Sequence, residues 1–278
     1  MLSDRKVDCS GPLLDEAAVY RIFDVYILEA RLRPALMAIS PAVVSLVLLW
    51  PADVLVWRSI SVVLVICGAA VLLTHLARAR GRTLEIVLFE RWGGKPTTAL
   101  LRHRDTRLDA NTKLRYLNFL SSHVPGWQPP TAQEEKDDAQ SSDARFDSAI
   151  RWLLEYSRDR RAFPLVFAEN VSYGFRKNLL GLKPIGMAIA IASILTTIFL
   201  IYLEVANRTA VTWLVLCYDI CAVLTWVWLV RSNWVKGAAD AYAHCLLAVA
   251  DAGEAPNRRK RRQAKTDPGL SRDRGNRT

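Results

Sequence analysis

Residues from which active sites and covalent cross-links are built are scarce in this sequence. Its 278 residues include four histidines and five cysteines, and their spacing matches no zinc site. Cys217 and Cys221 lie four residues apart in one apolar run, where a helix does not present the geometry of a disulfide, so we interpret them as small packing residues. A Gly-x-Ser-x-Gly motif and a catalytic Cys-His arrangement are also absent. We therefore expect no metal, no cofactor and no enzymatic activity.

Two short stretches contain fragments of phosphate-handling motifs. The residues GGKPTT, at 93–98, lack the P-loop spacing, and Pro96 removes a backbone N–H where such a loop needs a donor. The residues HRD, at 103–105, lack the Asn and the Gly-rich loop of a protein kinase. Neither stretch predicts nucleotide chemistry.

Long apolar runs dominate the sequence instead. They cover residues 34–50, 60–76, 184–203 and 212–230. Each run can cross about 30 Å of hydrocarbon as a helix, the first two if they extend slightly into their turn. The pattern predicts an all-α membrane protein whose four transmembrane helices form two hairpins, 34–76 and 184–230, with a mainly helical cytoplasmic domain inserted between them.

Lys and Arg residues beside the apolar runs predict the orientation. Several basic residues lie just before and just after each hairpin, whereas the only basic residues in the two short turns are Arg58 and Arg208. We therefore expect a multi-pass protein with both termini and the middle segment in the cytoplasm. Residues 1–33 are acidic and amphipathic, so we expect no cleaved signal peptide.

Four segments lie outside the predicted hairpins. Residues 1–33 form an N-terminal amphipathic helix, which packs on the chain's own middle domain or binds lipid. Residues 77–183 form a cytoplasmic sensor domain with 19 basic and 13 acidic residues, a net charge of +6. Residues 231–254 continue as a cytoplasmic amphipathic helix, and residues 255–278 form a disordered basic tail that contacts anionic lipid or nucleic acid.

Within the sensor domain, the patterns predict three helices and one loop. The helices cover residues 109–120, 144–160 and 164–180, and the first begins with an Asp-Ala-Asn-Thr capping signal. The polar, Pro-bearing residues 121–143 are interpreted as a loop. Residues 83–92 are either an extended stretch or a continuation of the second apolar run that ends at the following pair of glycines.

Basic residues of the sensor domain are interleaved with aromatic residues between positions 91 and 119. This mixture is typical of surfaces that follow a phosphate backbone and stack on bases, although a solvated or lipid-facing patch has the same composition. We expect a polyanionic ligand, either a single-stranded DNA oligomer or another nucleotide. The predicted ligand-binding residues are Arg91, Trp92, Lys95, Arg102, Arg104, Arg107, Lys113 and Arg115.

Asp219 lies near the middle of the last apolar run. A lone carboxylate at the bilayer centre costs about 2.5 to 3.5 kcal/mol on insertion scales, so it should face protein or water. Three interpretations of Asp219 are open. It pairs with a polar group on a neighbouring helix, it carries protons in a transporter, or copies of it form an acidic ring around an oligomer axis that favours cations. Thr212, Asp219 and Trp226 share a helix face at seven-residue steps, and Gly186 with Ala190 offers a small contact face. Adopting the oligomeric pore, we predict as pore-lining residues Asp219, Thr212, Glu204, Thr196 and Thr197.

Several stretches together resemble a known group of bacterial membrane proteins. These are RWGGKPTTALLRHRD at 91–105, VPG at 124–126, RWL at 151–153 and FPLVFAENVSYGFRKNLLGLKPIG at 163–186. Over about residues 80 to 230 the chain resembles the HalA-like membrane effectors of the two-gene Hailong anti-phage defence system.

This resemblance implies a tetrameric, ion channel-like effector in the bacterial inner membrane. DNA oligomers made by a partner nucleotidyltransferase would hold it closed, and their removal by phage nucleases would open it, depolarise the membrane and cause abortive infection. Two alternatives stay open: a membrane-anchored scaffold or binding protein without conduction, and a membrane enzyme with an unfamiliar site.

Overall fold

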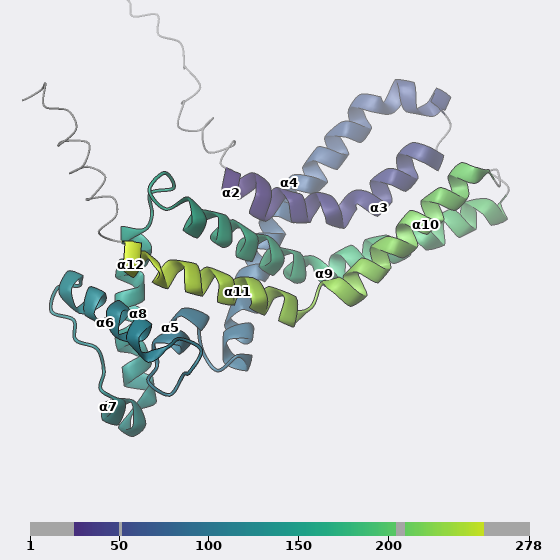
Figure 1. The fold of residues 1–278 in the computed structure, drawn as a ribbon. Helices are drawn as coiled ribbons and strands as arrows, with labels where there is room; N and C mark the ends of the chain where they lie inside the picture. The colour runs from purple at the N-terminus through teal and green to yellow at the C-terminus, as the bar shows by residue number, and fades with distance from the viewer. Residues whose placement is uncertain (1–24, 50–51, 204–208, 253–278) are drawn as a thin grey trace, which may run out of the picture. The chain divides into compact units, whose positions relative to one another are not determined.

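The computed structural model describes residues 25–49, 52–203 and 209–252, and all regular structure among them is helical (Figure 1). The chain divides into two compact units. The first unit comprises Met1–Leu84 and Gly174–Ser232, and the second comprises Glu85–Tyr173 and Asn233–Thr278. The predicted pore residue Glu204, the tail 255–278 and most of the predicted helix 1–33 lie outside the described residues.

Four helices are long and apolar enough to cross a membrane. The candidate spans are Leu28–Leu49, Ser61–Leu101, Pro164–Tyr202 and Ala210–Leu229. They confirm the four predicted membrane helices at the level of length and composition. Side chains such as Leu64 and Val65, which are 66% and 70% exposed, suit contact with lipid rather than water.

The helices of the first unit extend beyond the apolar runs. They are α2 (Val25–Ile27), the π-helical η1 (Leu28–Leu32), α3 (Arg33–Leu49), α4 (Ala52–Arg91), α9 (Pro164–Tyr202), α10 (Ala210–Leu224) and the π-helical η2 (Thr225–Leu229). The helix predicted at 164–180 and the span predicted at 184–203 are one helix, because α9 continues through Pro184. Both α4 and α9 contribute residues to the two units.

Small residues allow α4 and α9 to approach closely in the first unit. A Cβ atom added to Gly181 would lie 2.9 Å from the backbone nitrogen of Gly81, so the two backbones touch there. Asn178 fills the adjacent position and donates a hydrogen bond of 2.7 Å from Nδ2 to the carbonyl oxygen of Ala30 in η1. This bond connects α9 to the helix that leads into α3.

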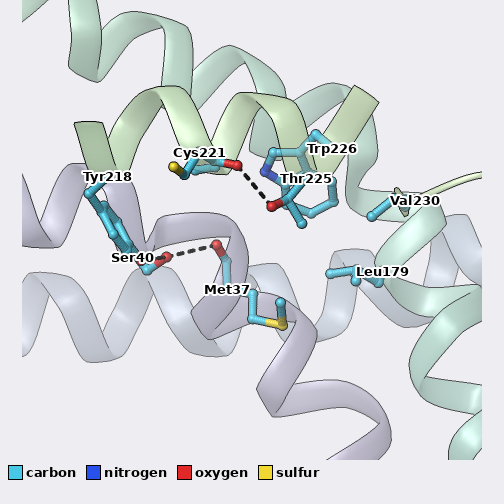
Figure 2. A pocket seen from close by; sticks show the side chains of 9 residues that line it. Met37, Ser40, Leu179, Tyr218, Cys221, Thr225, Trp226 and Val230 are labelled. Atoms are coloured by element: carbon cyan, nitrogen blue, oxygen red, sulfur yellow. Dashed lines mark hydrogen bonds between the residues drawn. The ribbon is translucent and has the colours of Figure 1, made fainter. Parts of the chain in front are cut away.

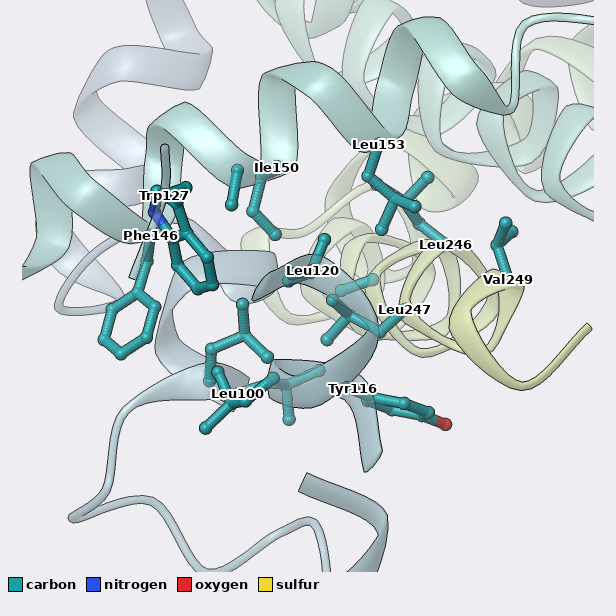
Figure 3. Close-up of a cluster of buried hydrophobic side chains, with 14 of the residues drawn as sticks. Leu100, Tyr116, Leu120, Trp127, Phe146, Ile150, Leu153, Leu246, Leu247 and Val249 are labelled. Atoms are coloured by element: carbon teal, nitrogen blue, oxygen red, sulfur yellow. The ribbon is translucent and has the colours of Figure 1, made fainter. Parts of the chain in front are cut away.

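The second unit contains shorter helices around one apolar core. They are α5 (Pro96–Leu101), α6 (Ala110–His123), α7 (Ala132–Asp137), α8 (Ala139–Tyr156), α11 (Ser232–Leu247) and α12 (Val249–Ala252). Leu120, Phe146 and Leu153 are fully buried and belong to the same cluster as Leu246 and Leu247 of α11 (Figure 3). The amphipathic helix after the last span is therefore part of this core.

The turn after α4 has the geometry that its two glycines predict. Gly93 and Gly94 have φ angles of 77° and 125°, which are accessible to glycine at little cost. The N–H of Gly94 bonds to the carbonyl of Phe89, and the N–H of Gly93 bonds to that of Glu90, which is a Schellman motif. Of the two predictions for residues 83–92, the continued helix is confirmed.

The predicted loop at 121–143 is wrong over its second half, where α7 and the start of α8 form. Thr131 and Glu134 make a capping box: the Thr131 hydroxyl accepts from the Glu134 N–H at 3.2 Å, and Glu134 Oε2 accepts from the Thr131 N–H at 2.6 Å. Asp138 then caps α8 by accepting from the N–H of Ser141 at 2.9 Å. The helix predicted at 109–120 is confirmed, with Asp109 as its N-cap.

Candidate functional site

The inward face of α10 and η2 carries the candidate site. Thr212, Asp219 and Trp226 are buried at seven-residue steps, whereas Cys217 and Cys221 are exposed on other faces. The predicted common face is therefore confirmed. It is directed into the first unit, because the Trp226 ring packs on Gly186 of α9, where an added Cβ would lie 2.2 Å from Trp226 Cζ2.

Asp219 is bound by hydroxyl groups from two other helices. Its Oδ2 accepts from Ser193 Oγ of α9 at 2.7 Å and from Ser45 Oγ of α3 at 3.2 Å. The two serine oxygens are 2.6 Å apart, and Ser193 Oγ also lies 3.3 Å from the carbonyl oxygen of Pro41. We call Asp219, Ser193 and Ser45 the Asp219 cluster.

The carboxyl group of this cluster has no basic partner within the apolar segments of its three helices. Asp219 itself has no exposed surface, and within the described part of the chain its Oδ1 has no hydrogen-bond partner. The segments 34–49, 184–203 and 210–229 contain no Lys, Arg or His. Two hydroxyl donors on one oxygen satisfy only part of what an ionised carboxylate accepts.

A groove of about 320 Å³ lies between α3 and α9 beside the cluster. Its wall is largely apolar, with Leu46 and Leu200 among its residues, but four residues that carry hydroxyl groups also line it: Ser45, Ser193, Thr196 and Thr197. Thr197 is fully buried, and its hydroxyl has no hydrogen-bond partner among the residues that the structure describes. We call this the hydroxyl groove.

The predicted pore-lining residues that the structure describes do not all lie at one place in the first unit. Thr197 and Thr196 line the hydroxyl groove, whose serines bind Asp219. Thr212 is buried on the same face as Asp219, about 10 Å further along the helix, with its hydroxyl 3.3 Å from that of Thr209. In this arrangement Asp219 is enclosed within its own chain.

A second pocket, of about 200 Å³, lies between α3 and the helix formed by α10 and η2 (Figure 2). Pro41 has no N–H, so the Met37 carbonyl loses its helical donor and instead accepts from Ser40 Oγ at 3.0 Å. The Tyr218 hydroxyl donates to Ser40 Oγ at 2.7 Å. The proline in α3 is thus compensated by hydroxyl groups, as helices in a membrane require.

The predicted basic face does not form as one open surface, because two of its members are buried. Arg102 donates to Asp143 through Nε at 2.8 Å and Nη2 at 2.6 Å, and through Nη1 to the Gly93 carbonyl at 2.7 Å. The hydrogen bonds that Arg102 donates to Asp143 raise the pKa of Arg102. Lys113 Nζ donates to the carbonyl oxygens of Arg102 and Asp105, each at 2.6 Å, and burial lowers the pKa of Lys113. The side chains of Arg102 and Lys113 therefore stabilise the fold of the second unit.

Most of the remaining predicted ligand residues are exposed but engaged in ion pairs. Those pairs are Lys95 with Asp147, Arg104 with Glu135, Arg107 with Asp105 and Asp240, and Arg115 with Asp251. Arg91 is exposed, and Trp92 is half-buried with its ring centroid 6.1 Å from that of Phe89. A polyanion would therefore have to compete with acidic side chains for four of these residues.

Sequence reasoning missed a strip of aromatic rings in the second unit. His123 stacks on Phe119 with ring centroids 4.1 Å apart, and Tyr156 stacks on Trp152 at 5.0 Å. Phe163 continues the strip at 5.8 Å from Tyr156. His123 is exposed and the other four rings are half-buried. The rings come from α6, α8 and the turn before α9, so only the fold brings them together.

Comparisons of the chain with protein-family models, curated proteins and solved structures gave no match. The geometry of the site therefore carries the functional argument.

Proposed function

We propose that this chain is an ion channel-like membrane effector of a bacterial inner membrane. The four apolar helices form two hairpins, both termini and the second unit are cytoplasmic, and several copies of the chain, four by the resemblance, make up the channel. Opening depolarises the membrane in anti-phage defence. The composition of the four helices and the positive flanks of the hairpins support this arrangement.

The observation that carries the proposal is the buried carboxyl group of Asp219, which is bound by two serines that line the hydroxyl groove and has one oxygen without a hydrogen-bond partner among the described residues. A membrane helix retains such a group at a cost of about 2.5 to 3.5 kcal/mol, and ionisable residues at this depth generally mark pathways for ions or protons. Hydroxyl oxygens beside a carboxylate can replace part of the water shell of a cation. The groove supplies four of them along α3 and α9.

The described arrangement suits a closed state. Asp219 has no exposed surface, so conduction requires that α3, α9 and α10 part around the cluster. A ligand can drive that change only if it binds the closed and open states with different affinity. The proposed ligand is a single-stranded DNA oligomer made by a partner nucleotidyltransferase, and its binding favours the closed state.

The aromatic strip is the best-supported ligand surface in the second unit. Base stacking on aromatic rings is sequence-tolerant and contributes about 1 to 3 kcal/mol per base. Exposed basic residues nearby in the sequence, Arg151 and Arg161, supply charge for phosphates. Arg91 and the paired arginines of the predicted basic face add to this charge.

The second candidate function is a membrane-anchored scaffold or binding protein without conduction. The hydrogen bonds from Ser193 and Ser45 to Asp219 favour it, because a carboxylate that is bound within one chain can fix three helices without any role in conduction. Both candidates predict a stable first unit, and they differ in ion flux.

Ion flux through purified protein in liposomes tests the proposed function. We expect sodium-dependent flux without ligand, and a reduction of that flux when short single-stranded DNA is added on the side of the second unit. Affinity for the DNA should fall steeply with salt, because phosphate contacts release counterions. Liposomes that stay impermeable with and without DNA would contradict the channel and leave the scaffold.

A further inference from the structure

Two buried oxygen atoms that face the interior of the first unit point to a bound ligand. Within the described residues, Asp219 Oδ1 and Thr197 Oγ1 are enclosed without hydrogen-bond partners. Such groups are rare in folded proteins and each calls for an explanation. Thr197 lies one helical turn from Ser193. Both residues line the groove together with Ser45, and the two serines are those that bind Asp219.

The hydrogens of the two serines are directed toward the cluster. Ser193 has one hydroxyl hydrogen, which it donates to Asp219 Oδ2 at 2.7 Å. Ser45 donates either to Ser193 Oγ at 2.6 Å or to Asp219 Oδ2 at 3.2 Å. With their hydrogens used in this way, both hydroxyls keep lone pairs, and both line the groove. The carboxylate polarises them, which makes them better ligands for a positive charge.

We infer that the hydroxyl groove binds one small, largely dehydrated monovalent cation, such as Na⁺, whose charge balances Asp219. A carboxylate and a monovalent cation together are neutral, which removes most of the cost of either charge in a hydrocarbon surrounding. The apolar wall of the groove, with Leu46, Leu49 and Ile189, cannot hold a hydration shell, so the hydroxyl oxygens replace part of it.

Other ligands fit this site less well. An anion would lie beside Asp219, and no basic side chain of α3, α9 or α10 within the spans could bind it. A divalent ion usually takes several carboxylates, and among the described residues there is no group of three or more His, Cys, Asp or Glu side chains that could hold a metal ion. A monovalent cation remains, with hydroxyl ligands in the groove and the Asp219 carboxylate behind Ser193 and Ser45.

This inference rests on the proposed function for the role of the ion, since both concern Asp219. Binding is measured without any membrane barrier, on the purified full-length chain in detergent micelles. We compare thermal unfolding in NaCl and in choline chloride at constant ionic strength, at pH 8, and measure ²²Na⁺ binding directly. A millimolar site should raise the midpoint Tm by about 3 to 6 °C between 1 and 100 mM Na⁺.

Matched variants locate the effect. Thr197→Val and Ser193→Ala should lose at least half of the Na⁺-dependent rise in Tm, and Asp219→Asn should lose all of it. Thr225→Val and Ser40→Ala remove hydroxyls that border the second pocket instead, and they should keep the full rise. If Asp219→Asn does not fold, the two groove variants still decide the matter.

Each outcome has a defined consequence. Equal unfolding in Na⁺ and choline, with no bound ²²Na⁺, overturns the cation site even if liposomes conduct. A Tm that rises with acid but not with Na⁺ shows that a proton neutralises the carboxyl, and it overturns the site too. Na⁺ binding that survives Thr197→Val and Ser193→Ala places the ion elsewhere and overturns the assignment. Na⁺ binding without liposome flux upholds the site and contradicts the channel.

Discussion

Substitution of Gly186 by alanine tests whether the face of α10 that carries Asp219 points into the first unit. The added methyl carbon would lie 2.2, 2.5 and 2.8 Å from three carbons of the Trp226 ring. Carbon atoms in contact are about 3.5 to 4.0 Å apart, so the ring must shift by about 1.5 Å or α9 must move away. Overpacking of this kind costs about 1 to 3 kcal/mol.

Gly68→Ala is the matched control for this substitution. Gly68 also lies within a candidate span, but an added Cβ there meets no atom within 4 Å, so the variant reports only the helix preference of alanine, about 0.5 to 1 kcal/mol. We expect Gly186→Ala to unfold more readily than Gly68→Ala by about 1 to 3 kcal/mol in an SDS titration followed by circular dichroism. Adding Trp226→Leu should remove at least about 1 kcal/mol of that difference. If Gly186→Ala and Gly68→Ala unfold alike, Trp226 does not pack on α9 and the inward orientation of Asp219 is wrong.

Three further predictions concern the second unit. Arg102→Met should lower the free energy of unfolding of the second unit in urea by about 2 to 4 kcal/mol, because it breaks a buried ion pair. The control Arg91→Met should change that free energy by less than about 0.5 kcal/mol. Equal effects of the two substitutions would contradict the structural role of Arg102. Hydrogen bonds from Thr131 above all lower the pKa of Glu134 to about 2, so its stabilising effect is present above about pH 4.5 and is lost as the pH falls toward 2. Glu134→Gln should make the urea midpoint depend less on pH across that range, and an unchanged pH dependence would refute the capping box. Gly93→Ala should cost about 1 kcal/mol through its positive φ alone, since nothing crowds the added Cβ, and a neutral result would contradict the Schellman turn.

Long apolar runs were sufficient to predict four helices of membrane-spanning length and composition, and residue spacing was sufficient to predict one buried face. Thr212, Asp219 and Trp226 could be grouped from seven-residue steps, because a helix returns to nearly the same side after two turns. The continuity of α9 from residue 164 to residue 202 could not be found in this way. An apolar run marks where hydrocarbon contact is favourable, whereas the helix itself continues through Pro184.

The partners of the charged residues could not be predicted from composition. Arg102 pairs with Asp143, 41 residues away, and Arg115 with Asp251, 136 residues away. A count of basic residues therefore overstated the surface open to a polyanion. Ser45 and its contact with Asp219 likewise depend on how three helices align, which no local pattern contains.

One signal in the sequence was available but overlooked. The residues Thr131 to Glu134 have the spacing of a capping box, which predicts the start of a helix. The prolines just before them are compatible with it, because a proline disfavours helix in the residues that precede it and leaves those that follow free to form one. Local capping chemistry was in this case a better guide than overall polarity.

Sodium flux through liposomes containing Asp219→Asn is the most direct test of the central claim that the Asp219 carboxylate contacts the conducted ion. The substitution keeps the size of the side chain and removes its charge, and Ser40→Ala is the control because it removes a hydroxyl outside the cluster. The account predicts that Asp219→Asn lowers Na⁺ flux by about tenfold or more while Ser40→Ala leaves it nearly unchanged, since a cation in a low-dielectric path loses its only counter-charge. Wild-type flux in Asp219→Asn, in protein shown to be folded, would contradict it.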